Sequence, residues 1–159
     1  MSSLEFQRSL PGKRMGAGLL VRDSSGRVLL VEPTYKPNWE LPGGAVYADE
    51  SPREYVVREA REELGLSVTL GRLLVLDYQH PEPGRTESMM FVFDGGVVDA
   101  AWASRIGVPE VELRGWRFVP PAGVGELASP RLCRRLDRAL AAVTTAGTTL
   151  YLENGQPQH

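Results

Sequence analysis

Three glutamates within one short segment, Glu59, Glu62 and Glu63, have the spacing of side chains that share one face of a helix. Residues three and four positions apart lie about one turn apart, so an α-helix here gathers the three carboxylates into one patch. The patch falls near the end of the predicted helix, where the helix dipole disfavours each anion by about 0.3–1 kcal/mol. Repulsion between Glu59 and Glu63 adds about 0.2–0.5 kcal/mol. An arrangement with this cost indicates a role other than stabilising the helix.

A solvated acidic face balanced by Arg58 and Arg61 is the alternative explanation, since Arg58 can pair with Glu54 and Glu62. Two features favour a metal site instead. The acids lie at the unfavourable end of the helix dipole. The loop Gly43-Gly44 precedes the helix with backbone carbonyls free to point outward. Carboxylate and carbonyl oxygens are the ligands that Mg²⁺ prefers, so the sequence predicts a magnesium site.

The surrounding pattern resembles the Nudix box at every specified position: Gly44, five residues, Glu50, seven residues, then Arg58-Glu59-Ala60-x-Glu62-Glu63-x-Gly65-Leu66. Three flanking segments resemble the same family more weakly, namely Gly26–Val31, Trp39–Gly44 and Trp116–Pro120. The resemblance therefore extends over most of residues 15–145, although only the box is highly specific.

The resemblance implies an α/β fold, a Nudix-type α/β/α sandwich with a central mixed sheet. It also implies a Mg²⁺-dependent hydrolase, with Mn²⁺ as a substitute. Such an enzyme cleaves a phosphoanhydride bond in a nucleoside diphosphate linked to another moiety, for example a nucleoside triphosphate or an ADP-ribose-like compound. The alternative is a non-catalytic Nudix-like module that binds or senses a nucleotide. Such modules usually lose acids of the box, and none is lost here.

Site residues follow from the resemblance by position. The implied metal ligands are Glu59, Glu62 and Glu63, together with the carbonyl of Gly44. Either Glu62 or Glu63 is also expected to act on the attacking water, and the position of the general base stays open. Arg58 is expected to orient the acids and so to serve catalysis, while Glu50 and Gly43 support the box from its loop.

Substrate selection in this family depends on residues outside the box, where the signals are weaker. The candidates are aromatic residues that can stack on a base, cations that can contact phosphate, and acids that can join the metal site: Tyr35, Trp39, Lys36, Arg85, Glu87, Glu110 and Glu112. Each also fits a plainer role, because aromatic residues beside strands usually pack in the core and loop charges are usually solvated.

The elements that must position these residues can be predicted from local signals. Ala17–Val21 and Arg27–Glu32 are predicted strands joined by a turn, and Pro42-Gly43-Gly44 is a predicted break. A helix is expected to begin after the N-cap Ser51, with Glu54 completing a capping box, and to end at Gly65.

Later segments complete the expected sandwich. Strands are predicted within Ser67–Tyr78, Ser88–Val98 and Trp116–Val119. A second helix is expected after Ser129-Pro130, with apolar residues at helical spacing on one side: Leu132, Leu136, Leu140 and Val143. Tyr151-Leu152 is either a final strand or part of a frayed tail.

Composition bounds the remaining expectations. A chain of 159 residues with 42% hydrophobic content predicts one domain, assigned to residues 14–145, with a flexible arm at 1–13 and a tail or short strand at 146–159. A net charge of −2 without a basic run argues against a nucleic-acid polymer as partner. No apolar run approaches the roughly 20 residues needed to cross a bilayer. We expect a cytoplasmic protein with a nucleotide-type small-molecule partner, and the resemblance alone favours a homodimer.

Overall fold

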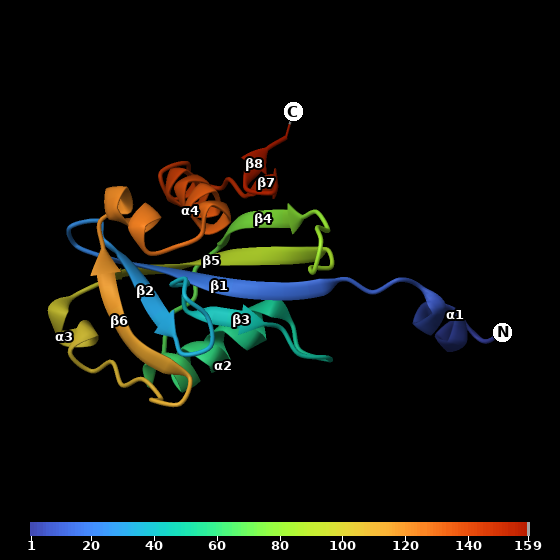
Figure 1. Cartoon of the computed structure of the whole chain (residues 1–159), viewed down its shortest axis with the longest axis horizontal. Helices are drawn as coiled ribbons and strands as arrows, with labels where there is room; N and C mark the ends of the chain where they lie inside the picture. The colour runs from blue at the N-terminus through green and yellow to red at the C-terminus, as the bar shows by residue number, and fades with distance from the viewer. Residues whose placement is uncertain (159) are drawn as a thin grey trace.

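The structure, a computed structural model, describes residues 1–158 and consists of one mixed eight-stranded sheet with helices on both faces (Figure 1). The strands are β1 (Arg14–Asp23), β2 (Val28–Pro33), β3 (Gly43–Ala45), β4 (Leu73–Gln79), β5 (Ser88–Val98), β6 (Leu113–Val119), β7 (Leu150–Glu153) and β8 (Gln156–Pro157). The helices are α1 (Ser3–Ser9), α2 (Pro52–Leu64), α3 (Ala100–Ala103) and α4 (Pro130–Val143), with a 3₁₀ segment η1 (Pro121–Glu126). The predicted sandwich is confirmed, with α2 on one face of the sheet and α4 on the other.

Strand β1 lies in the middle of the sheet, in the order β6-β2-β1-β5-β4-β7-β8. It pairs in parallel with β5 along its whole length. Its other edge pairs with β3 near the start, at Gly18 opposite Gly43, and with β2 near the end, at Arg22 opposite Val28. Strands β2 and β3 therefore separate along this edge, and the loop that connects them comes to lie beside the start of β1.

Alternation along β1 divides the interior into two cores. Ala17 and Leu19 face α2 and pack with Val56 and Leu64. Leu20 belongs to the other core, which α4 covers. Since successive strand residues point to opposite faces, a single strand serves both layers. Residues of β1 can thus contribute to a site on either face.

Helix α2 has the predicted ends. The Ser51 hydroxyl accepts a hydrogen bond from the Glu54 backbone N–H at 3.0 Å, and Pro52 opens the helix. Gly65 closes it in the left-handed conformation, with φ of 71°, and its N–H donates to the Arg61 carbonyl. The return bond from the Glu54 side chain is not among the hydrogen bonds of residues 1–158, so the predicted capping box is only half formed.

Several elements differ from the local predictions. The Pro-Gly-Gly segment was predicted as a break, yet its glycines form β3, because pairing with β1 supplies the partners that local sequence does not show. The strand predicted within Ser67–Tyr78 begins only at Leu73. Short α1, α3 and η1 were not predicted. Helix α1 has no buried residue and extends away from the domain (Figure 1), consistent with an arm.

The C-terminal segment is a strand and not a frayed tail. Strand β7 pairs in parallel with β4, and Leu152 is fully buried (0% exposed) in the core under α4. The Arg72 guanidinium donates to the carbonyls of Ala142 and Thr148, which ties the segment before β7 to the sheet. The structural domain therefore extends beyond residue 145. Within residues 1–158, no helix has the length and apolar character that a membrane crossing requires.

The packing of β7 gives a stability prediction. Leu152→Ala should lower the free energy of unfolding by about 2–5 kcal/mol, because it removes buried apolar surface and leaves a cavity in the core. Tyr151→Ala, a half-exposed neighbour (48% exposed), is the control and should cost clearly less. Urea denaturation followed by circular dichroism measures both. Equal, small effects would show that β7 does not contribute to the folded sheet.

Candidate active site

Glu59 and Glu63 lie side by side on α2, close enough for one carboxyl group to hydrogen-bond the other. Glu63 is only 7% exposed, and the Gly43 backbone N–H donates to its Oε2 at 3.4 Å. Burial, and after it the negative charge of Glu59, raises the pKa of Glu63 to about 9. Burial also raises the pKa of Glu59. Two carboxyl groups thus share a site that disfavours their charge.

A third acid faces this pair from another element. Glu112 lies in the turn before β6, and its negative charge adds to the rise in pKa of both Glu59 and Glu63. Its backbone carbonyl accepts a hydrogen bond from Thr34 N–H, which fixes the turn to the start of the β2–β3 loop. A residue far along the chain therefore completes an acidic side of the site.

Arg58 is held by acids on both sides. Its Nε and Nη2 donate to the two carboxylate oxygens of Glu50 at 2.9 Å, a bidentate pair, and its Nη1 donates to Glu62 at 3.0 Å. The guanidinium also stacks on the Tyr47 ring at 4.8 Å and the Tyr55 ring at 5.2 Å. These bonds lower the pKa of Glu50 and raise that of Arg58. Arg58 is therefore fixed between Glu50 and Glu62 by salt bridges.

Glu62 is not where the helical spacing alone would place it. Its side chain is about half exposed and turns toward Arg58, one helical turn earlier. Arg58 Nη1 lies 3.0 Å from Glu62 and 3.6 Å from the nearest oxygen of Glu59, so its salt bridge with Glu62 is the shorter one. Within residues 1–158, no three acidic, histidine or cysteine side chains converge closely enough to hold a metal ion in this arrangement. The structure brings two of the three predicted carboxylates together and leaves the third in a salt bridge.

The glycines before the helix have distinct roles. A side chain on Gly43 would place its Cβ 2.0 Å from the Ala17 carbonyl oxygen, and its φ of 143° also favours glycine. Pro42 and Val46 flank β3, and they are hydrogen-bonded to Leu19 and Met15 of β1. Hydrogen-bonded pairs occur at every second position of an antiparallel ladder, so Gly44 and its partner Ala17 form such a pair as well. Gly44 therefore directs its backbone toward β1, and Gly43 directs its backbone toward Glu63. The Gly43 N–H is thus the backbone group that contacts Glu63, while the Gly44 carbonyl as a metal ligand stays a prediction.

A cleft of about 490 Å³ opens beside Glu63 and Gly43. It extends past the glycine-rich start of β1 to the underside of α4. Its charged lining residues are mostly cations: Arg14, Lys36, Arg85, Arg131 and Arg135, against Glu40 and Glu63. An anionic ligand is therefore favoured in a protein whose overall charge is negative.

The end of the cleft under α4 contains a second buried polar group. Arg135 donates through Nε to Asp77 Oδ2 at 2.8 Å, and the second oxygen of Asp77 accepts from Gly155 N–H at 3.0 Å. Next to it, the Ser88 hydroxyl donates to Gln79 Oε1 at 2.9 Å. Arg135, Gln79 and Ser88 all line the cleft. The cleft thus has the acidic pair at one end and this polar cluster at the other.

Comparison with known proteins identifies the family of this chain. The family model described as NUDIX domain matches residues 12–141. The chain belongs to the Nudix family. A putative 8-oxo-dGTP diphosphatase of Bacillus subtilis is 30% identical over 77% of this chain and 76% of that protein. The CTP pyrophosphohydrolase of Escherichia coli is 40% identical over 43% of this chain and 52% of that enzyme.

Solved structures agree with the family assignment. The MutT protein of Methanosarcina mazei has a TM-score of 0.67 and 26% identity, covering 88% of this chain and all of that chain (100%). A UDP-X diphosphatase has a TM-score of 0.72 at 18% identity, covering 96% of this chain and 75% of that chain, a likeness of fold alone. The chain is therefore a Nudix hydrolase with pyrophosphohydrolase relatives.

The Nudix cleft includes some of the predicted substrate contacts and not others. Tyr35, Lys36 and Arg85 line it, and Lys36 pairs with Glu40 at 2.7 Å. Trp39 instead packs against the core under α4, with Arg117 over its ring at 5.0 Å. The plainer explanation of an aromatic residue beside a strand is therefore the better one for Trp39.

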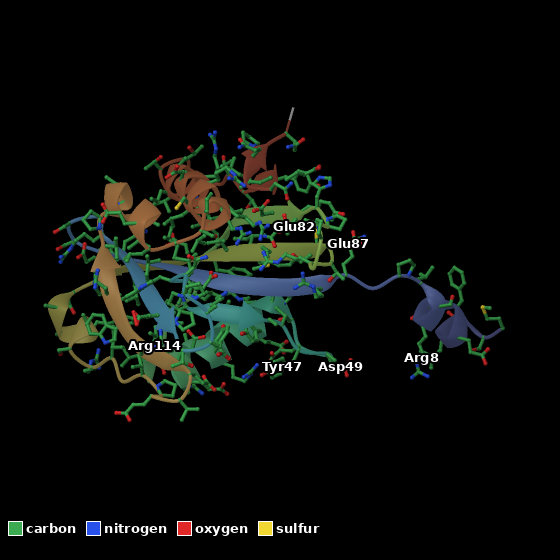
Figure 2. The ribbon with its side chains drawn as sticks, in the orientation of Figure 1. Arg8, Tyr47, Asp49, Glu82, Glu87 and Arg114 are labelled. Atoms are coloured by element: carbon green, nitrogen blue, oxygen red, sulfur yellow. The ribbon has the colours of Figure 1, made fainter. Side chains whose placement is uncertain are left out.

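The remaining predicted acids lie outside the cleft lining. Glu87 pairs with Lys13 at 2.6 Å and accepts from the Tyr78 hydroxyl at 2.7 Å. Figure 2 shows Glu87 with Glu82 at the end of the sheet where β4 leads into β5. Glu110 lies exposed in the turn before β6. Only Glu112 of these acids influences the carboxyl pair.

Sequence reasoning missed the polar cluster under α4. Asp77 and Gln79 alternate with Val75 on β4, so a polar pair on an otherwise apolar strand face was a visible signal. Arg135 lies among the apolar residues of α4 and is itself buried. Their meeting depends on contacts between residues 58 positions apart, which local patterns do not report.

The carboxyl pair fits a divalent cation. Glu63 is nearly buried with one long backbone N–H as donor, and the closest guanidinium nitrogen to Glu59 is 3.6 Å away. A buried carboxyl group holds its proton unless a positive charge lies close by, and a bound cation supplies that charge. Oxygen donors of this kind are those that Mg²⁺ and Mn²⁺ accept.

The raised pKa of Glu63 predicts how stability of the metal-free protein depends on pH. Because the folded state holds the proton more tightly than the unfolded state, this group stabilises the fold below its ordinary pKa of 4.5. That contribution is lost as the pH rises through its folded value of about 9. Unfolding free energies measured in urea with a chelator present, from pH 5 to 9, should therefore fall more steeply for the native protein than for Glu63→Gln. Parallel curves for the two proteins would show that Glu63 is not buried in this way.

Proposed function

We propose that this Nudix hydrolase uses Mg²⁺ to cleave a phosphoanhydride bond in a nucleoside triphosphate or a related nucleoside diphosphate derivative. The observation that carries the proposal is the pair of Glu59 and the buried Glu63, beside a cleft whose charged lining residues are mostly cations. A bound divalent ion would neutralise charge on the phosphate oxygens and hold the attacking water. In the reaction, water oxygen bonds to one phosphorus and the bridging oxygen leaves on the other.

The residues of this chain have separate tasks in that proposal. Glu59 and Glu63 would hold the ion, with backbone support from Gly43. Arg58 positions the ligands by keeping Glu50 and Glu62 in fixed salt bridges, and Glu62 reaches the site only by leaving Arg58. Phosphoryl transfer depends mainly on positioning and charge stabilisation, so fixed supports of this kind contribute to rate.

Cations at the cleft wall suit the phosphate chain. Lys36 and Arg85 line the cleft, and Arg14 is fixed at its rim by hydrogen bonds to the Thr86 hydroxyl and carbonyl. The names of the relatives support triphosphates, since one is a putative 8-oxo-dGTP diphosphatase and another a CTP pyrophosphohydrolase. A nucleotide-sized substrate also fits a cleft of about 490 Å³.

A panel of substrates tests the proposal. Nucleoside triphosphates, ADP-ribose, sugar nucleotides, dinucleoside polyphosphates and a 5′-triphosphate RNA would be incubated with Mg²⁺ or Mn²⁺, and the products separated by ion-exchange chromatography. We expect metal-dependent release of pyrophosphate or phosphate from at least one nucleoside triphosphate. Binding without turnover of any compound would favour the non-catalytic module, and turnover of the RNA alone would contradict a small-molecule substrate.

Removal of one charge tests the role of Glu63. Glu63→Gln should lower kcat by about 100-fold or more, on the scale of losing a key electrostatic contact to the transition state, while the metal-free protein stays folded. Glu54→Gln, an exposed acid on the same helix, is the matched control and should keep full activity. In thermal melts, Mg²⁺ should raise the melting temperature of the native protein and of Glu54→Gln, and raise that of Glu63→Gln much less.

Equal activity of the Glu63 and Glu54 variants would remove Glu63 from the metal site. An unfolded Glu63→Gln protein without metal would instead identify the acid as a structural partner.

A further inference from the structure

Arg135 has a buried nitrogen without a hydrogen-bond partner. The residue is 6% exposed, and its Nε is bonded to Asp77, yet its Nη2 has no partner within residues 1–158. Leaving a buried donor unpaired destabilises a folded protein. Such donors in folded proteins are almost always satisfied by protein, water or a ligand. Because Arg135 lines the cleft, a bound molecule can reach it.

The neighbouring groups add a second donor. Gln79 Oε1 accepts from the Ser88 hydroxyl, so the NH₂ group of Gln79 is left to donate. Gln79 and Ser88 are both buried and both line the cleft. Two donors at one end of the cleft call for a ligand with acceptor atoms there.

The charge balance favours a neutral acceptor over an anion. Asp77 is fully buried and already compensates the charge of Arg135 at 2.8 Å. A phosphate placed beside this neutral pair would bring an uncompensated negative charge into a buried site, which is costly. A carbonyl oxygen accepts the same hydrogen bond without that cost.

The walls of this part of the cleft suit a flat ring. On the face of β1 under α4, Gly16 and Gly18 present no side chain. The thioether of Met90 lies over Gly16, where an added Cβ would be 2.5 Å from the Met90 Cε. Leu132 of α4 lines the same space. Apolar walls with donors at one end match a heterocycle that bears a carbonyl group.

We infer that Arg135 is a specificity-determining residue that donates a hydrogen bond to a ring carbonyl of the substrate's base. The inference rests on the proposed function, because the base must be joined to the phosphates near Glu63. Guanine and hypoxanthine carry an acceptor oxygen at position 6, beside the acceptor N7, whereas adenine carries an amino donor there. The enzyme therefore selects bases with an oxo group and rejects adenine, for which Arg135 Nη2 would stay unpaired.

Inosine triphosphate and ATP test this selection, because they differ only at two neighbouring ring positions. Position 6 carries an oxo group in inosine triphosphate and an amino group in ATP, and N1 carries a hydrogen in inosine triphosphate alone. The native enzyme should show a kcat/KM at least about tenfold higher for inosine triphosphate. Arg135→Lys keeps a positive charge near Asp77 but loses the planar fork, so it should remove most of that preference by lowering the value for inosine triphosphate alone. Arg138→Lys, an exposed arginine on the same helix, should leave both values unchanged.

A merely structural role for Arg135 would lower kcat/KM equally for both nucleotides, and that result would overturn the inference. A native enzyme that hydrolyses both equally, or prefers ATP, would overturn it as well. Should R135K fail to fold at the assay temperature, the D77N/R135Q double variant, which removes both charges together, replaces it and should lose the same preference.

Binding separates this inference from the proposed reaction. Non-hydrolysable α,β-methylene analogues of the two nucleotides, titrated by calorimetry with Mg²⁺ present, report selection without turnover. Tighter binding of the inosine analogue, lost in R135K, supports the inference even if no nucleotide is hydrolysed and the proposed activity fails. Equal binding of the two analogues overturns it even if hydrolysis is found.

Discussion

Withdrawing a carboxyl group from water costs several kcal/mol unless a nearby group compensates its charge, and Glu63 is almost completely withdrawn. Among residues 1–158, its one hydrogen-bond donor is the Gly43 N–H at 3.4 Å, and the Glu59 carboxyl lies beside it on the helix. The protein accepts this arrangement although the helix dipole and Glu112 both oppose it. In the proposed function, a bound cation would offset these penalties by compensating the negative charge. The rest of the site can be understood as what keeps Glu59 and Glu63 in that position.

Two devices hold the pair. On one side, Arg58 binds Glu50 in a bidentate salt bridge above the rings of Tyr47 and Tyr55, which holds its guanidinium 3.6 Å from Glu59. On the other side, Gly43 of β3 donates its N–H to Glu63 of α2. Any side chain at this position would clash with β1, because its Cβ would lie 2.0 Å from the Ala17 carbonyl oxygen. An arginine free to turn would neutralise Glu59 directly and leave no need for a cation. The salt bridges of Arg58 therefore have two effects: they fix Glu50 and Glu62, and they prevent Arg58 from turning to neutralise Glu59.

The parts predicted from sequence are those governed by local rules. The caps of α2 at Ser51 and Gly65 depend on residues within one turn, and so does the crowding of the acids. The fold was predicted from the Nudix resemblance and from strand-like runs separated by turn residues. Local rules failed where a distant residue decides. Gly43 and Gly44 form a strand only because β1 is adjacent, and Leu152 is buried only because β4 provides an edge.

Glu62 shows the same limit within the predicted site. Helical geometry places it beside Glu59 and Glu63, but rotation about its side chain lets it join Arg58 instead, and spacing cannot decide between these positions. The substrate candidates depended still more on tertiary structure. Trp39 and Tyr35 are both aromatic residues near the same loop, yet one packs in the core and the other lines the cleft. Chain position alone does not distinguish them.

The two ends of the cleft differ in how their charges are balanced, and this difference orients a substrate. At the acidic end, the one positive group of residues 1–158 within salt-bridge range of Glu59 and Glu63 is Arg58, at 3.6 Å from Glu59. That end therefore suits a bound cation, and a cation there would attract the phosphates. At the end under α4, Asp77 balances Arg135 at 2.8 Å, so that end needs only a neutral acceptor. A nucleotide bound in reverse would put its anionic phosphates beside a neutral pair and its uncharged base beside unbalanced carboxylates. Electrostatics alone therefore favours one direction of binding, with the phosphates toward α2 and the base toward α4.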